Sequence, residues 1–265
     1  MKKIIAIPVI TALLSFSHLA AAGAILIING SSSTIESDTT SAITNNLRTL
    51  HIAAGNTVTV VDTVPIGFAG FSQVWDIRFS ESGALTTANR TSYLSYLQGG
   101  GGMFVMGENS RFMARNRSIF GLIGDAGGGS IGPNLIGDCD GVQNVIGPFR
   151  GPNAVASVDF NCSGVVASRG TGNWITSRAD NSGGSGIAFG AGSLSLARLG
   201  ALTTIFDVNF MSGSDGAGKQ ELTKNLIGFI EQQVNPGGGG NNVPLPGSLA
   251  LLGLGLLGIK LRARK

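Results

Sequence analysis

Two acidic residues follow segments that have the apolar pattern of buried strands. Glu108 comes just after the run 103–106, and Asp207 closes the run 202–207. Because parallel strands end at the same edge of a sheet, we expect both carboxylates at the edge where α/β folds bind ligands. The sequence therefore predicts a ligand crevice formed by Glu108, Asn109 and Asp207. There a carboxylate could bind sugar hydroxyls or a metal ion, or act as a base.

A structural interpretation of Glu108 is the one that we favour, because carboxylates near the start of a helix stabilise it. In this interpretation Glu108 caps the next helix or pairs with Arg111 or Arg115. The basic stretch Arg111, Arg115 and Arg117 would place its first two members on one helix face. That face could bind an anionic glycan or a phosphate, but the pattern favours a solvated helix surface.

The chain offers little for histidine or metal chemistry. His51 lies near the end of the first predicted helix, where we expect a partly exposed side chain. The acidic segments 137–141 and 207–215 are similar to pieces of a calcium site but lack its ligand spacing. The glycine-rich run 127–132 lacks the Lys-Ser or Lys-Thr of a phosphate-binding loop. We therefore predict no catalytic residue, no metal and no cofactor.

Strand and helix patterns alternate along the part of the chain that must position these residues. An order of strand, helix, two strands, helix and strand indicates an α/β fold with a mainly parallel sheet covered by helices. Residues 154–160 and 187–189 are weaker strand candidates, and the pairing of strands between 125 and 200 is left open. The remaining strand patterns cover 24–28, 57–61, 74–79, 103–106 and 202–207, and the helical patterns cover 36–50, 86–97 and 218–233.

The N-terminus has the pattern of an export signal. Lys2 and Lys3 precede the apolar run 4–16, and three alanines at 20–22 supply the small residues that a signal peptidase requires. We predict a signal peptide over residues 1–22, with cleavage after Ala22.

The C-terminus has the pattern of a tethered apolar segment. A Gly/Asn-rich linker, 235–243, precedes the uncharged run 248–259, which together with its proline-containing start is just long enough to cross a bilayer. Four cations close the chain and would hold that end in the cytoplasm. We predict a membrane-spanning helix within residues 244–265.

This tripartite tail resembles the PEP-CTERM sorting signal of Gram-negative bacteria. The short proline motif is Val243, Pro244, Leu245 and Pro246, followed by the apolar helix and the basic end. Leu245 stands where the commonest motif has Glu, which leaves open which exosortase acts. The resemblance implies export, processing by signal peptidase and an exosortase, transient anchoring in the inner membrane, and a final location at the cell surface or outside the cell.

The two cysteines fit an exported chain. Cys139 and Cys162 are the only cysteines, and a pair of thiols in an oxidising compartment favours a disulfide. Such a bond would contribute about 3 kcal/mol by closing a ring of about 24 residues. Zinc binding is disfavoured because two thiols lack partner ligands, and a free reactive thiol is a more distant alternative.

The domain 23–234 resembles the class I glutamine amidotransferase-like superfamily in its non-catalytic or divergent branches. The segments that carry the resemblance are 98–108, with its glycine run, strand and elbow, and 200–211, followed by a last helix that contains Asn225. The resemblance implies a flavodoxin-like three-layer sandwich. The enzymes of that superfamily need a cysteine in the elbow and a histidine base. Here the elbow has no cysteine, and His51 is in the wrong part of the chain.

The basic character of the chain comes from its two ends. The formal charge is +3, but six of the eighteen cations lie in residues 1–22 and 260–265, where there is no acid. The twelve remaining cations face fifteen acids, which leaves −3 and disfavours a nucleic-acid partner. We expect an exported protein that binds a partner, such as a polysaccharide of a biofilm matrix, or serves as a structural component. The alternative is a divergent hydrolase or metal-dependent enzyme that acts on carbohydrate or peptide through Glu108 and nearby acids.

Overall fold

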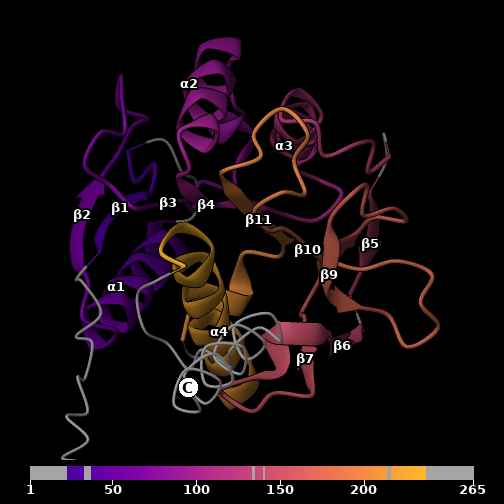
Figure 1. Cartoon of the computed structure of the whole chain (residues 1–265). Helices are drawn as coiled ribbons and strands as arrows, with labels where there is room; N and C mark the ends of the chain where they lie inside the picture. Colours follow the sequence, from indigo (N-terminus) through magenta and orange to yellow (C-terminus); the bar gives the residue numbers. More distant parts are fainter. Residues whose placement is uncertain (1–22, 33–36, 133–134, 140, 214–215, 237–265) are drawn as a thin grey trace, which may run out of the picture. The chain divides into compact units, whose positions relative to one another are not determined.

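The computed structural model describes residues 23–32, 37–132, 135–139, 141–213 and 216–236 (Figure 1). The predicted signal peptide, nearly all of the linker and the predicted sorting segment lie outside these residues. In the described part of the chain, no helix combines the length and the apolar character that crossing a membrane requires.

One half of the main sheet is parallel. Its strands are, in spatial order, β2 (Thr57–Val61), β1 (Ala24–Ile28), β3 (Gln73–Asp76), β4 (Gly102–Gly107) and β11 (Ala201–Phe206). All residues of β3, β4 and β11 are buried, as expected for strands covered on both faces. The sequence predicts all five strands, although β3 ends at Asp76 and the chain leaves the sheet three residues earlier than expected.

The other half of the sheet is antiparallel and comes from the region whose pairing the sequence leaves open. Strand β10 (Gly186–Phe189) pairs with β11, followed in space by β9 (Asn173–Ser177), β6 (Val142–Val145) and β7 (Ser157–Asp159), which completes nine strands. Strands β5 (Ile136–Asp138) and β8 (Ser163–Val165) form a separate two-stranded sheet. The mixed α/β class is thus confirmed, with the change of direction at β11.

In the described part of the chain, four α-helices cover the two faces of the sheet (Figure 1). Helices α1 (Ser37–Ala53) and α4 (Ala217–Val234) pack into one apolar cluster, and α2 (Thr87–Gln98) and α3 (Met113–Asp125) into the other. The strands supply both clusters alternately: Ile25 and Ile27 of β1 belong to the first, Leu26 and Ile28 to the second. The described domain therefore has three layers.

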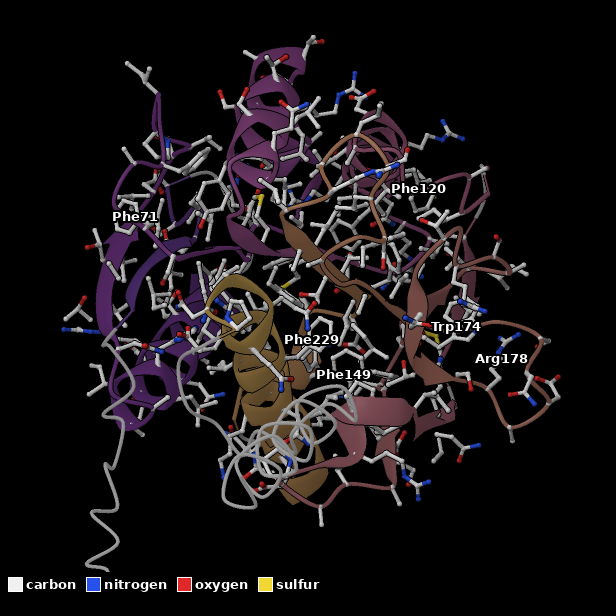
Figure 2. The ribbon with its side chains drawn as sticks, viewed as in Figure 1. Phe71, Phe120, Phe149, Trp174, Arg178 and Phe229 are labelled. Atoms are coloured by element: carbon white, nitrogen blue, oxygen red, sulfur yellow. A yellow bond between two sulfur atoms is a disulfide. The ribbon has the colours of Figure 1, made fainter. Side chains whose placement is uncertain are left out.

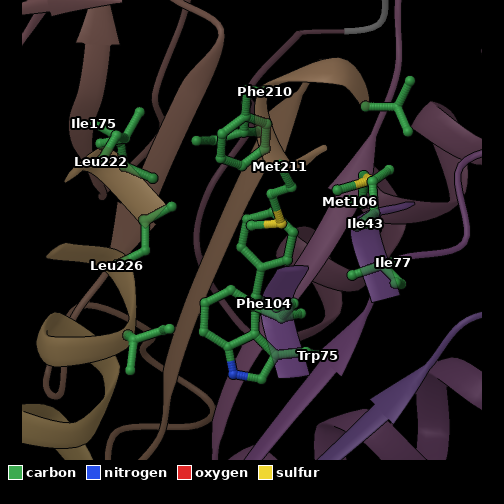
Figure 3. Close-up of a cluster of buried hydrophobic side chains, with 14 of the residues drawn as sticks. Ile43, Trp75, Ile77, Phe104, Met106, Ile175, Phe210, Met211, Leu222 and Leu226 are labelled. Carbon is green, nitrogen blue, oxygen red and sulfur yellow. The ribbon is translucent and has the colours of Figure 1, made fainter. Parts of the chain in front are cut away.

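Aromatic side chains fill the cluster under α1 and α4 (Figure 3). Trp75 of β3 stacks on Phe104 of β4 with 5.0 Å between ring centroids, and Phe104 contacts Phe210. The last belongs to a short 3-10 helix, η3 (Asn209–Met211). In a second short helix, η2 (Gly147–Arg150), Phe149 meets Phe229 of α4 at 4.8 Å, a pair that Figure 2 labels.

Helix α2 shows how local sequence sets an element's limits. Thr86 caps its start, and a reciprocal pair of hydrogen bonds between Thr86 and Asn89 completes the capping box. Gly99 ends the helix, and Gly100 adopts φ +92°, a conformation that favours glycine. The chain then enters β4 directly, which brings the elbow after β4 to the opposite edge of the sheet.

Candidate functional site

The carboxyl edge of the parallel strands brings together the acids that the sequence singles out. Glu108 follows β4 and Asp207 follows β11, and Gly107 and Phe206 are paired in register. One Glu108 oxygen, Oε2, accepts a hydrogen bond from the Val208 backbone N–H at 2.6 Å. Both carboxylates are buried, with 3% and 1% of their residue surfaces exposed. The two acids thus lie at one edge of the sheet, but their side chains are packed inside the protein and have little contact with solvent.

The polar side chains at this edge form hydrogen bonds with backbone groups. Glu108 Oε1 accepts from the Asn109 N–H at 2.9 Å, and Asp207 Oδ1 accepts from the Asn209 N–H at 2.7 Å. Asn116 of α3 clamps the elbow, because its amide both accepts from the Glu108 N–H and donates to the Glu108 carbonyl. In this arrangement Glu108 ties the end of β4 to the end of β11.

The start of α3 is capped by an acid that the sequence analysis did not consider. Glu81, in the 3-10 helix η1 (Glu81–Gly83), accepts hydrogen bonds from the backbone N–H groups of Ala114 and Arg115 at 2.8 and 3.2 Å. The role that we expected of Glu108 at this helix therefore belongs to Glu81.

Our prediction of a solvated helix face that carries Arg111 and Arg115 is wrong. Helix α3 begins at Met113, so Arg111 precedes it, and Arg115 is completely buried. The guanidinium of Arg115 reaches Asp76 Oδ2 at 3.2 Å and donates to the carbonyls of Gly83 and Met106. A helical pattern shows which residues share a face, but not whether that face meets solvent.

Asp76 is the centre of a buried charged cluster. Its carboxylate accepts from Arg78 at 2.7 Å, from the Tyr93 hydroxyl at 2.9 Å and from Arg115. Burial alone would raise the pKa of Asp76, but the charges of Arg115 and Arg78 hold this pKa below its usual range. Burial raises the pKa of the Tyr93 hydroxyl well above its usual value. The sequence signal for this cluster is the pair of opposite charges, Asp76 and Arg78, within the predicted strand 74–79.

His51 is not the partly exposed residue that we expected. It is completely buried, and its ring meets the Trp75 ring edge-on at 5.0 Å. Its Nδ1 lies 3.3 Å from the amide nitrogen of Asn56. Burial lowers the pKa of His51 to about 3, so the ring is neutral in the folded protein at ordinary pH.

A second polar group of the carboxyl edge was missed at the loop after β1. The hydroxyls of Ser31 and Ser32 and the backbone N–H of Ser32 all donate to Asp62, which follows β2. The bonds from Ser32 lower the pKa of Asp62. The order of the strands reverses between β1 and β3, so the loop after β1 borders the topological switch point of the sheet, whereas Asp62 lies on the β2 side of that loop.

The opposite, amino edge of the parallel strands carries a hollow of about 570 Å³. Its walls are the loop 66–72 before β3, one face of α2, the glycine turn 99–101 before β4, and the end of α4 at Val234 and Asn235. None of the described residues that line it has a charged side chain. The sequence analysis did not identify this site, although the glycine turn belongs to it.

The described residues contain no group of three or more His, Cys, Asp or Glu side chains arranged to hold a metal ion. The two calcium-like fragments extend outside the described part at Asp140 and Asp215. Cys139 and Cys162 are joined by a disulfide, in agreement with the expectation, and Cys139 directly follows β5 while Cys162 precedes β8. The bond therefore links the two strands of the small sheet.

The fold defines a class of protein, namely three-layer α/β domains in which a parallel half-sheet continues into antiparallel strands. A solved ThuA-like protein from Bacteroides uniformis ATCC 8492 is similar, with a TM-score of 0.54 and 11% identity over 84% of this chain and 96% of that one. The mmIFT52 N-terminal domain has a TM-score of 0.50 and 13% identity over 83% and 99%. These likenesses concern the fold alone, and the amidotransferase-like assignment of the core stays a prediction.

An enzyme is also among the similar structures. The exo-beta-1,4-mannosidase Op5Man5 from Opitutaceae bacterium strain TAV5 has a TM-score of 0.50 and 11% identity over 79% of this chain, which matches 36% of the enzyme. No curated protein matches the chain in sequence.

The C-terminal end of the chain, unlike the folded domain, matches a sequence family. Residues 242–265 match the PEP-CTERM protein-sorting motif. This match confirms the sorting motif that includes Val243, Pro244, Leu245 and Pro246, and with it an exported protein that an exosortase processes, bound for the cell surface or the extracellular space.

Proposed function

We propose that this is an exported binding protein of the cell surface or extracellular matrix, with a polysaccharide as its partner and without catalytic activity of its own. The observation that carries the proposal is the PEP-CTERM match at residues 242–265, which assigns the chain to a sorting route. A signal peptide over 1–22 and transient anchoring through a helix in 244–265 belong to the same proposal.

The buried state of the acids supports binding over catalysis. A general base must reach a proton of its substrate, whereas both Glu108 carboxylate oxygens accept from backbone N–H groups and the residue is 3% exposed. Asp76, the acid at the end of β3, is held in a cluster with Arg78 and Arg115. The geometry of these acids therefore does not support the alternative that the protein is a hydrolase.

The sorting part of the proposal is tested in cells that contain an exosortase. The full chain is compared with a chain that lacks residues 243–265, and membrane, periplasmic, surface and medium fractions are blotted. We expect the truncated chain to be absent from the surface and medium fractions, because it lacks the segment that the exosortase recognises. An unchanged distribution would refute the proposal.

A double substitution refines this test. Pro244→Ala with Pro246→Ala changes the proline motif but keeps the apolar segment and the basic end, so we expect an unprocessed chain that stays in the membrane fraction. Asn241→Ser with Asn242→Ser is the matched control in the adjacent linker, and it should be processed like the natural chain.

A further inference from the structure

The hollow at the amino edge is built by glycines and aromatic rings. Gly99, Gly100 and Gly101 form one wall, and an added Cβ on Gly101 would lie 2.2 Å from the Tyr96 ring. The absence of a side chain at Gly101 thus lets the Tyr96 ring lie directly on the backbone. Phe68 packs 5.3 Å from Tyr96 between ring centroids, and the half-buried Phe71, labelled in Figure 2, completes the aromatic part.

Four hydroxyl groups of the hollow donate hydrogen bonds to backbone carbonyls. Tyr96 donates to the Phe71 carbonyl at 3.1 Å, and Ser72 donates to the Ala24 carbonyl at 3.3 Å. On α2, Thr91 and Ser95 each donate to the carbonyl four residues earlier, both at 3.0 Å. Each hydroxyl oxygen keeps acceptor lone pairs. At these four positions the walls therefore offer hydrogen-bond acceptors, which an incoming ligand can match with donors of its own.

The absence of charged side chains among the described residues that line the hollow limits the classes of ligand that it can bind. The lining side chains are apolar, hydroxyl or amide groups, and burial raises the pKa of the Tyr96 phenol, which stays neutral. At Asn235 one side-chain N–H donates to Glu231 at 2.7 Å, and the amide oxygen can accept a hydrogen bond. A described lining without a cationic side chain disfavours anions, and it has no carboxylate to bind a cation.

We propose that this hollow binds a neutral pyranose unit of a polysaccharide. A pyranose has an apolar ring face, which fits against Phe71 and Tyr96, and hydroxyl groups, which can donate to the oxygens of Thr91, Ser95 and Asn235. The volume of about 570 Å³ lies in the range of small-ligand sites. This inference rests on the proposed function, because it names the ligand class and the site of that binding role.

The test measures binding of the exported protein, purified from cells, by isothermal titration calorimetry. The probes are neutral hexaoses of glucose, mannose and galactose, with an oligogalacturonate hexamer as the anionic counterpart. We expect saturable binding of at least one neutral hexaose and at least about tenfold weaker binding of the anionic one. Failure of the whole neutral panel, or equal binding of the anionic hexamer, would overturn the proposal.

Matched variants locate the site. Phe71→Leu keeps an apolar side chain but removes the ring, and we expect about tenfold weaker binding of the neutral hexaose. Phe120→Leu is the control, because Phe120 is also half-buried but lies outside the hollow (Figure 2). Equal affinities of the two variants would contradict the site.

A second variant does not depend on packing. Ser95→Arg places a charge on an exposed position of the hollow, with Ala88→Arg on the same helix as its control. We expect Ser95→Arg to abolish binding and Ala88→Arg to preserve it, and retained affinity in Ser95→Arg would refute the site. If the natural protein is sorted normally to the surface but binds none of the neutral hexaoses, this inference fails while the sorting role stands, so the two failures are distinguishable.

Discussion

Neutral His51 is part of the packing between α1 and the sheet. Its ring meets Trp75 edge-on, and burial lowers its pKa from 6.5 to about 3. In the unfolded chain the same ring takes up a proton near pH 6.5. Between these two values the unfolded state binds one proton more than the folded state, so stability rises with pH in this interval and falls on acidification.

We predict that the free energy of unfolding decreases by about 2 kcal/mol between pH 7.5 and pH 5.0 because of His51 alone. Urea unfolding at the two pH values measures it. Asp76 also has a lowered pKa, but its contribution is lost only below its ordinary value of 3.8, outside this interval. In His51→Gln the decrease should nearly vanish. Phe149→Leu, the control, should be less stable but keep the same pH dependence, and an unchanged decrease in His51→Gln would contradict the assignment.

Side-chain environments were the part of the site that the sequence predicted least well. The types and spacing of Glu108 and Asp207 suffice to place them at one sheet edge, because strand ends follow from local apolar runs. Whether Arg115 meets water or Asp76 depends on which face of α3 packs on the sheet. That choice is made by distant partners, here Asp76 and the carbonyl of Gly83.

At the scale of elements, the local pattern predicts the parallel half of the sheet well. Its strands are continuous apolar runs, and its helices have regular apolar spacing and clear ends, such as Thr86 and Gly99. The region between β4 and β11 is harder, because β7 of the main sheet and β5 and β8 of the small sheet have three residues each and their pairing is non-local. The disulfide between Cys139 and Cys162, beside the small sheet, is a link in that region that the sequence indicates directly.

Two glycines, one in a crowded position and one in an open position, give a prediction at the scale of elements. A Cβ on Gly200, just before β11, would lie 2.4 Å from the Leu97 carbonyl oxygen of α2, whereas a Cβ on Gly228 of α4 meets nothing within 4 Å. We expect Gly200→Ala to lower the free energy of unfolding by about 1–3 kcal/mol through overpacking. Gly228→Ala, the matched control, should raise it by about 0.5–1 kcal/mol because alanine favours a helix. Both are measured by urea unfolding, and equal effects would contradict the close approach of α2 and β11.

At the scale of the whole molecule, charge separates the sorting segments from the folded domain. Residues 1–22 carry two cations and the terminal segment 243–265 carries four, while all fifteen acids lie between them. The full chain therefore has a formal charge of +3, and loss of the N-terminal segment alone leaves +1. Loss of the C-terminal segment alone leaves −1, and loss of both leaves −3. Each processing step thus moves the isoelectric point by a distinct amount.

We predict that the protein recovered from the cell surface focuses below pH 7, although the sequence pI of the full chain is about 9.1. Isoelectric focusing with mass determination measures this, and the chain that lacks residues 243–265 from the start is the marker for the −1 and −3 forms. The −3 form should also fail to bind duplex DNA at low salt, because it has no net positive charge to replace counterions. A surface form that focuses above pH 8 would show that the basic end is retained, and would contradict processing at the proline motif.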